Sequence, residues 1–257
     1  MPTLKQQLAD KTPILGTFVK TPHYHITEVL SLSELDVLCL DAEHAPFDRI
    51  ALDSGVLSCR AGNMPVLVRV PNDHPDTLLN ALDIGAQGVV VPHVKTAEQL
   101  QNIVRNSKFG DGGRGYAGST RAAGYTSKKM PENLAANQRE TVVIAQIEDL
   151  IALDNLEAIC QVQEVDCLFI GRVDLTVALG ETDLNAPSVI TALERIIEVA
   201  NNNGVTTGMF VADLSELPSW ISRGVSLFLL SSDHGFLLSG AKQLSKQFQD
   251  SCKNSDI

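Results

Sequence analysis

Short apolar runs rich in β-branched residues recur along the chain and alternate with longer amphipathic stretches. Several of these runs are apolar at every position, which is typical of parallel strands buried on both faces. The runs predict eight strands, at Ile14–Val19, Val37–Asp41, Val66–Val70, Gly88–Pro92, Val142–Ile147, Cys167–Gly171, Thr206–Val211 and Ser226–Leu230.

The stretches between these runs have helical periodicity, and several follow Asp, Ser or Thr, which are common N-cap residues. Gly85, Gly204 and Gly224 each stand between a predicted helix and the next strand, where a helix C-terminus favours glycine. Eight strand–helix units in 257 residues favour a (β/α)8 TIM barrel, as a single domain over residues 1–257. A doubly wound sheet fits less well, because it usually has fewer strands and a glycine-rich first turn. The helices are expected at Thr77–Leu82, Ala97–Asn106, Ile151–Gln161, Ser188–Asn202 and Leu214–Arg223.

The segment from Phe109 to about Glu140 interrupts this rhythm. It is rich in glycine, polar and basic residues and shows no apolar period. A connection of this length inside a domain is usually functional or mobile. Because it follows the fourth predicted strand, we expect a long active-site loop at about 109–140, on the C-terminal face of the barrel.

Composition and charge exclude several classes of protein. The chain has 44% hydrophobic and 20% charged residues and a net charge of −11, without a Lys/Arg cluster, so we expect no nucleic-acid partner. It has neither an apolar run long enough to span a membrane nor an apolar leader, so we expect a cytoplasmic protein. Its five cysteines are scattered and odd in number, which favours buried thiols over disulfides or zinc ligands.

Charged and polar residues follow the predicted strands at their carboxyl ends. The positions concerned are Asp41, Glu43, His44, Arg69, Gln146, Glu148, Gly171, Asp174, Ser231, Ser232 and Asp233. On a barrel these ends surround one mouth. We therefore expect Glu148, Asp174, His44 and Arg69 to meet, although they are distant in sequence.

Each of these residues also has a purely structural interpretation. Asp174 and Asp233 could cap the helices that follow them, and His44 could be a solvated loop residue. Arg69 is different, because a cation inside an apolar strand is costly unless it is paired, which favours a functional role. No role is assigned to the other histidines, of which His93, at the end of the fourth strand, could most readily reach the mouth.

Two carboxylates without thiols or a histidine cluster suit a hard divalent cation such as Mg²⁺ or Mn²⁺, and a loosely selective site would also accept Co²⁺ or Zn²⁺. A metal and a guanidinium together suit an anion that carries a carbonyl, because both stabilise developing enolate charge. A histidine, whose pKa is near neutrality, would then move the proton.

At these positions the sequence resembles the HpcH/HpaI family of class II, metal-dependent pyruvate aldolases, which includes 2-dehydro-3-deoxyglucarate aldolase and 4-hydroxy-2-oxoheptanedioate aldolase. The resemblance spans most of the chain, and the ordered set of motifs is more specific than any one of them. The motifs are Gly16-Thr-Phe18, Asp41-Ala-Glu-His-Ala-Pro46, Val68-Arg-Val-Pro71, Leu82-Asp-Ile-Gly-Ala-Gln-Gly88 with Val91-Pro92, Gln146-Ile-Glu148 and Phe169-Ile-Gly-Arg-Val-Asp-Leu175.

The resemblance implies a barrel whose last helix is exchanged between subunits, and a homo-hexamer built from dimers. It implies reversible cleavage of a 4-hydroxy-2-oxoacid to pyruvate and an aldehyde through a metal-bound pyruvate enolate. A Schiff base is not expected, because Lys20 and Lys95, the two lysines near strand ends, are flanked by loop residues.

The resemblance also implies residue roles. Glu148 and Asp174 would ligate the metal, while Gln146, Asp174 and the backbone around Val173 would hold pyruvate. Arg69 would stabilise the enolate, and His44 would be the general base. Asp83 would raise the basicity of His44, although it could also be a solvated helix-end carboxylate, and Asp41 could orient His44 instead.

Two departures from the family concern the second substrate. Arg172-Val173 stands where the family usually has Pro or Ala after the glycine, and the 109–140 segment carries the additional Arg114 and Arg121. These three cations suggest an anionic aldehyde or a second oxoacid.

Two other functions fit the same pocket. One is the metal-independent condensation of oxoacids carried out by citrate-forming relatives of siderophore synthesis, and the other is non-catalytic binding of a 2-oxoacid or a metal.

Overall fold

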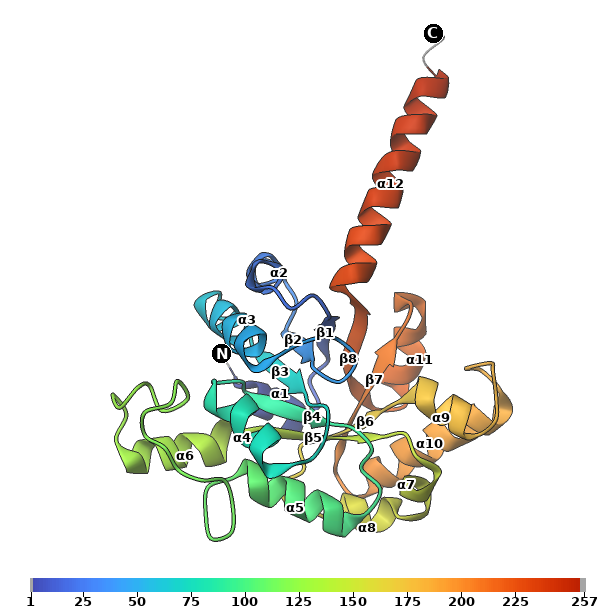
Figure 1. Cartoon of the computed structure of the whole chain (residues 1–257). Helices are drawn as coiled ribbons and strands as arrows, with labels where there is room; N and C mark the ends of the chain where they lie inside the picture. The colour runs from blue at the N-terminus through green and yellow to red at the C-terminus, as the bar shows by residue number, and fades with distance from the viewer. Residues whose placement is uncertain (1, 255–257) are drawn as a thin grey trace.

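Eight parallel strands close into a barrel in the computed structural model, which describes residues 2–254 (Figure 1). Each strand pairs with the next in sequence, and β8 pairs with β1. The predicted single-domain (β/α)8 TIM barrel is therefore confirmed. The strands are β1 (Ile14–Val19), β2 (Val37–Asp41), β3 (Val66–Arg69), β4 (Gly88–Val91), β5 (Val142–Ile147), β6 (Cys167–Ile170), β7 (Thr206–Val211) and β8 (Val225–Ser232).

Helices surround the barrel and connect its strands. They are α1 (Leu4–Ala9), α2 (Tyr24–Leu30), α3 (Arg49–Ala61), α4 (Pro75–Asp83), α5 (Ala97–Ser107), α6 (Met130–Glu140), α7 (Leu150–Asp154), α8 (Leu156–Cys160), α9 (Arg172–Ala178), α10 (Pro187–Asn202), the 3₁₀ turn η1 (Leu214–Glu216), α11 (Leu217–Ser222) and α12 (Asp233–Asn254). The helix predicted at Ile151–Gln161 is divided at Asn155 into α7 and α8. The helix predicted at Leu214–Arg223 begins as η1. Cys39, Cys59, Cys160 and Cys167 are buried and unpaired, as expected for thiols of the core.

The prediction for the segment 109–140 is wrong in two respects. Its last third is the helix α6, which begins with Pro131 in its first turn and buries Asn133 and Asn137. The remaining residues, 108–129, follow α5 rather than β4 directly. A barrel helix runs antiparallel to its strand and returns the chain to the N-terminal rim, so the segment starts on the rim opposite to the expected one.

Side chains alternate between the inside of the barrel and the layer beneath the helices, as the two-residue period of a strand requires. In β2, for example, Val37 and Cys39 belong to the inner cluster, whereas Leu38 and Leu40 pack beneath the helices. At the N-terminal rim, α1 closes the barrel by adding Leu4 and Leu8 to the inner cluster. The opposite, C-terminal end is therefore left for polar side chains.

The last helix, α12, does not pack along the barrel. It continues from β8 and projects away from the other elements (Figure 1). Leu237, Leu244 and Phe248 on this helix are between 62% and 69% exposed. No helix in residues 2–254 is long and apolar enough to cross a membrane.

Candidate active site

The charged residues at the C-terminal mouth continue the inward pattern of their strands. Asp41 follows Val37 and Cys39 in this pattern, Arg69 follows Leu67, and Gln146 follows Val142 and Ile144. Since the inner positions below them are apolar, these polar side chains form the top layer of the barrel interior.

Asp41 and Arg69 form a buried ion pair across neighbouring strands. The two residues are direct partners in the β2–β3 register. Arg69 donates from Nε to Asp41 Oδ1 at 3.0 Å and from Nη2 to Oδ2 at 2.7 Å. Burial alone would raise the pKa of Asp41, but the hydrogen bonds and charge of Arg69 outweigh it and hold that pKa below its ordinary value. The ion pair with Asp41 therefore explains how the charge of Arg69 is accommodated in an apolar strand.

Glu148 lies just beyond β5 and is 3% exposed. Gln146 Nε2 donates to its Oε2, and the backbone N–H of His93 donates to its Oε1 at 2.8 Å. A Cβ atom on Gly171 would stand 2.5 Å from Glu148 Oε2, so only glycine permits the close approach of β6 to this carboxylate. His93 itself has a left-handed backbone, with φ of 55°, of the kind that recurs at functional sites.

Glu43, His93 and Glu148 form a cluster able to hold a cation. One ligand atom from each lies within 4.8 Å of the other two. Glu43 Oε2 and Gln146 Oε1 are buried and have no hydrogen-bond partner within residues 2–254. Unsatisfied buried oxygens are costly, and a hard divalent cation or a ligand would satisfy them. The donor set therefore fits a divalent cation.

The charges of this cluster act on one another. Burial raises the pKa of Glu43, and the nearby Glu148 adds to this effect, although Arg69 and His44 oppose it. Burial alone would lower the pKa of His93, but Asp149, Glu148 and Glu43 outweigh it and raise that pKa. Carboxylates that share a site disfavour one another's charged form, and a bound cation would relieve this repulsion.

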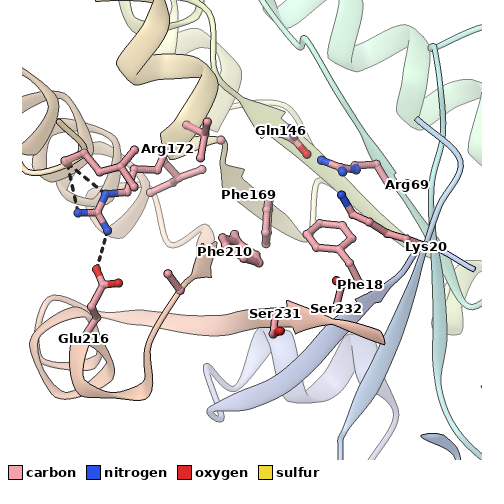
Figure 2. A pocket seen from close by; sticks show the side chains of 15 residues that line it. Phe18, Lys20, Arg69, Gln146, Phe169, Arg172, Phe210, Glu216, Ser231 and Ser232 are labelled. Carbon is pink, nitrogen blue, oxygen red and sulfur yellow. Dashed lines mark hydrogen bonds and ion pairs between the residues drawn. The ribbon is translucent and has the colours of Figure 1, made fainter. Parts of the chain in front are cut away.

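A cavity of about 370 Å³ opens beside these residues. Arg69, Lys20, Gln146 and Phe18 lie on one side of it, and Phe169 and Phe210 lie in the middle of the view (Figure 2). The guanidinium carbon of Arg69 is 4.4 Å from the centre of the Phe18 ring. The cavity thus combines a cation and an amide with apolar walls, as small-molecule sites commonly do.

The structure brings some of the predicted site residues together and separates others. Arg69, Gln146 and Val173 line the cavity. Glu148 does not line it but is hydrogen-bonded to Gln146. Asp174 lies in the first turn of α9, three residues after Gly171, and its side chain is exposed and outside the lining.

His44 and Asp83 are not brought together within the chain. The His44 side chain is 54% exposed, its Nε2 is 3.7 Å from Glu43 Oε2, and its backbone N–H donates to Asp41 Oδ1. Asp83 ends α4 at the N-terminal rim, where its Oδ1 is 3.8 Å from Arg114 Nε. A single chain therefore does not form the predicted contact between His44 and Asp83.

Two of the three arginines expected to attract an anion, Arg121 and Arg172, have other partners. Arg121 donates to Asp53 Oδ2 at 2.8 Å, far along the chain on α3, and to the Ile84 carbonyl at 2.9 Å. Arg172 does line the cavity, but its Nη1 donates to Glu216 Oε2 at 2.6 Å (Figure 2). The Arg172 guanidinium makes three further hydrogen bonds, from Nε and Nη2 to Leu184 O and from Nη2 to Asn185 Oδ1. The expectation that these arginines present free charge to a substrate is wrong for Arg172 and Arg121, which are neutralised by the chain itself.

Sequence analysis assigned no role to three residues that the structure places at the site, namely Lys20, Glu43 and His93. Lys20 follows Phe18 by two positions, so the inward pattern of β1 would have identified it. Its Nζ is 3.5 Å from Asp41 Oδ2, and one third of its side chain is exposed.

Residues 15–239 match the family model described as HpcH/HpaI aldolase/citrate lyase. A hydroxypyruvate/pyruvate aldolase of Paraburkholderia phytofirmans is 30% identical over 248 residues, covering 93% of this chain and 95% of that protein. A 5-keto-4-deoxy-D-glucarate aldolase of Klebsiella pneumoniae is 32% identical over 225 residues, covering 87% of each chain.

Solved structures of similar proteins have the same fold. An HpcH/HpaI aldolase/citrate lyase family protein from Burkholderia cenocepacia superposes with a TM-score of 0.89 at 32% identity, covering 96% of this chain and 98% of that one. The citrate synthase SbnG superposes with a TM-score of 0.85 at 26% identity, covering 96% of this chain and 99% of that one.

Proposed function

The chain belongs to the HpcH/HpaI aldolase/citrate lyase family, and from this premise we propose that it is a divalent-metal-dependent aldolase. It would cleave or form a 4-hydroxy-2-oxoacid, with pyruvate and an aldehyde as the other reactants. The observation that carries the proposal is the group formed by Arg69, Gln146 and Glu148 at one cavity. Beside it, the buried oxygens Glu43 Oε2 and Gln146 Oε1 accept no hydrogen bond within residues 2–254.

Arg69 and Gln146 are suited to hold the oxoacid. Within residues 2–254, the hydrogen bonds of the Arg69 guanidinium all go to Asp41, through two of its nitrogens. The remaining donors are available for the carboxylate or enolate oxygen of a ligand. Because Asp41 holds the guanidinium rigidly, little conformational entropy is lost when a substrate binds.

Glu148 would hold the cation together with Glu43 and His93, and Mg²⁺ or Mn²⁺ suits this largely carboxylate set. Asp174, the second ligand that the resemblance implies, would have to turn toward the ion from its exposed position in the first turn of α9. When bound, such an ion polarises the 2-oxo group and stabilises the negative charge of an enolate.

His44 would act as the general base that moves the proton. In cleavage, removal of the proton from the 4-hydroxyl group lets the C3–C4 bond break, which releases the aldehyde and leaves the bonding electrons on the pyruvate enolate. Protonation at C3 then yields pyruvate. Asp41 fixes the backbone of His44 by accepting its N–H at 3.1 Å, so the loop that carries the base is tied to the Arg69 pair.

The subunits would have to associate for the complete set of predicted residues to meet. The apolar side chains Leu237, Leu244 and Phe248 lie 7 and 4 residues apart on α12, which places them on one face of the helix. We infer that this face packs on another copy of the chain, as the resemblance to hexameric relatives with exchanged helices implies. An action of Asp83 on His44 would likewise join residues of different subunits.

The reaction is tested by offering pyruvate with a panel of aldehydes in Mg²⁺, Mn²⁺ and Co²⁺, and by following the hydroxy-oxoacid product. Product that forms only with an added metal, without a borohydride-trapped adduct, is the expected result. The similarity to a citrate synthase supports a second candidate, the condensation of two oxoacids. Product formation in EDTA would favour that candidate, and a trapped adduct would contradict both.

A further inference from the structure

A second polar cavity lies at the N-terminal rim, on the side of the barrel opposite to the catalytic mouth. Its volume is about 110 Å³. It is bounded by the segment 108–129, by α6 and by the C-terminal ends of α3 and α4, and shares no lining residue with the candidate active site. We call it the N-rim cavity. Three cations line it, Arg60, Arg114 and Lys128.

Arg114 is the most unusual of these cations. It is 6% exposed, and within residues 2–254 its guanidinium, including the buried Nε, makes no hydrogen bond. The nearest carboxylate oxygen, on Asp83, is 3.8 Å from Nε, beyond hydrogen-bond distance. One face of the guanidinium stacks on Phe109, with 4.1 Å between its carbon and the ring centre. A buried cation without hydrogen bonds is costly, which indicates that its donors are meant for a ligand.

Asn133 supports the same conclusion. It is 5% exposed and lines the N-rim cavity, yet its side-chain amide makes no hydrogen bond within the described part of the chain. The neighbouring Asn137 differs, because its amide donates to Thr141 Oγ1 and accepts from the Phe109 N–H. Two buried side chains with unused donors, Arg114 and Asn133, thus face one small cavity.

The charge balance around the cavity favours an anion. Arg60 and Lys128 make only long contacts, of 3.4 Å each, to the carbonyls of Gly85 and Ala122. Glu140 also lines the cavity, but Arg139 already pairs with it at 2.6 Å. Among the described residues, Asp83 therefore remains as the nearby carboxylate that could offset the charge of the three cations.

We propose that the N-rim cavity binds a phosphate group, either inorganic phosphate or the phosphoryl end of a small phosphomonoester. Arg114 and Asn133 would donate to its oxygens from the cavity wall, and Arg60 and Lys128 would neutralise its second charge. Guanidinium donors are well matched to phosphate oxygens. The cavity has room for such a group, since one liquid water occupies about 30 Å³.

Binding there would add a second link between elements that Arg121 and Asp53 already connect. The anion would link the segment 108–129 and α6 to the last turn of α3. Because the ligand binds the folded state, it would also raise the free energy of unfolding in proportion to its occupancy.

The test uses the full chain and measures phosphate binding by titration calorimetry and by the thermal midpoint, against chloride at equal ionic strength. Saturable binding that saturating pyruvate does not displace is expected. Lys128→Gln, an exposed position, should weaken the affinity about tenfold, and Arg114→Gln should abolish saturable binding. Arg195→Gln, on the exposed face of α10, serves as the control and should bind as the wild type does.

A parallel titration with glycerol phosphate separates the two sources. Weaker binding than that of inorganic phosphate assigns the site to the free ion, and equal or tighter binding assigns it to a phosphomonoester. The proposal is overturned if phosphate acts no more strongly than chloride, or if Lys128→Gln binds as tightly as the wild type. The second comparison remains decisive even if Arg114→Gln fails to fold.

Discussion

Arg69 and Asp41 are cross-strand partners whose side chains meet through two hydrogen bonds inside the mouth of the barrel. Asp41 is fully buried, and 7% of Arg69 is exposed. The pair neutralises the cation and at the same time fixes the direction in which its remaining donors point. The same carboxylate accepts the backbone N–H of His44, so one aspartate positions both the predicted enolate stabiliser and the predicted base.

Replacing Asp41 by asparagine removes the buried carboxylate that is hydrogen-bonded to Arg69 and leaves Glu43, whose Oε2 is 3.4 Å from Arg69 Nε, as a more distant countercharge. We expect Asp41→Asn to lower the free energy of unfolding at pH 7 by about 3 kcal/mol or more, measured by urea denaturation. The pKa of Asp41 is held below its ordinary value, so its contribution is complete at neutral pH and is lost as the pH falls through that lowered pKa. Asp48→Asn, which alters an exposed N-cap, is the control and should cost about 1 kcal/mol or less. Equal losses in the two variants would contradict the interpretation.

Among the cations that line the cavity, Lys20 has the weakest interactions with other residues of the described chain. Its one acidic contact, Asp41, is already paired with Arg69. We expect Lys20→Met to lower kcat/KM about tenfold for an aldehyde that carries a carboxylate, with little change for a neutral aldehyde of similar size. Lys95→Met is the matched control, because Lys95 pairs with Asp149 outside the cavity lining. A uniform loss with both aldehydes would argue against a role for Lys20 in substrate choice.

Lys108 makes stability depend on pH. Burial, followed by the charge of Lys5, lowers the pKa of Lys108 to about 8. Between pH 8 and the ordinary lysine value of about 10.4, the folded state has lost this proton while the unfolded state keeps it. Stability contributed by this residue therefore rises with pH in that window. We expect the difference in unfolding free energy between the wild type and Lys108→Met to shift in favour of the wild type from pH 7 to pH 9.5. Parallel pH profiles of the two proteins would contradict the lowered pKa.

The exposed apolar face of α12 predicts assembly. The double variant Leu244→Asp and Phe248→Asp should form smaller particles than the wild type in sedimentation velocity and light scattering. Lys246→Asp, on the opposite face of the helix, should leave the size unchanged. If Asp83 acts across a subunit boundary, the dissociated double variant should also lose aldol activity. A wild type that sediments as a monomer would disprove the packing of α12 on a second copy.

Much of the fold could be predicted from the sequence because barrel strands are apolar at successive positions. The β1, β2, β5 and β7 boundaries agree with the predicted runs. The site was harder to predict, since a single Glu43 or His93 after a strand has the same appearance as a solvated loop residue. Their grouping depends on how the loops at the mouth curve, including the left-handed backbone of His93.

The position of the segment 108–129 was misjudged for a different reason. The helix α5 separates it from β4 and so determines the rim at which it starts. The partners of Arg121 and Arg172 also could not be predicted, because Asp53 and Glu216 are 68 and 44 residues away in sequence.

The central claim is that Glu148 helps to hold a divalent cation that the reaction needs. The most direct measurement is the exchange of pyruvate methyl protons with deuterated water, followed by NMR before and after chelation and after Mn²⁺ or Mg²⁺ is restored. The wild type should lose exchange with chelator and regain it with metal. With metal restored, Glu148→Gln should exchange protons more than about 100-fold more slowly than the wild type. A loss of that size exceeds the effect of losing a residue that only supports a metal ligand. Full exchange by the chelated wild type, or wild-type exchange by Glu148→Gln, would contradict the claim.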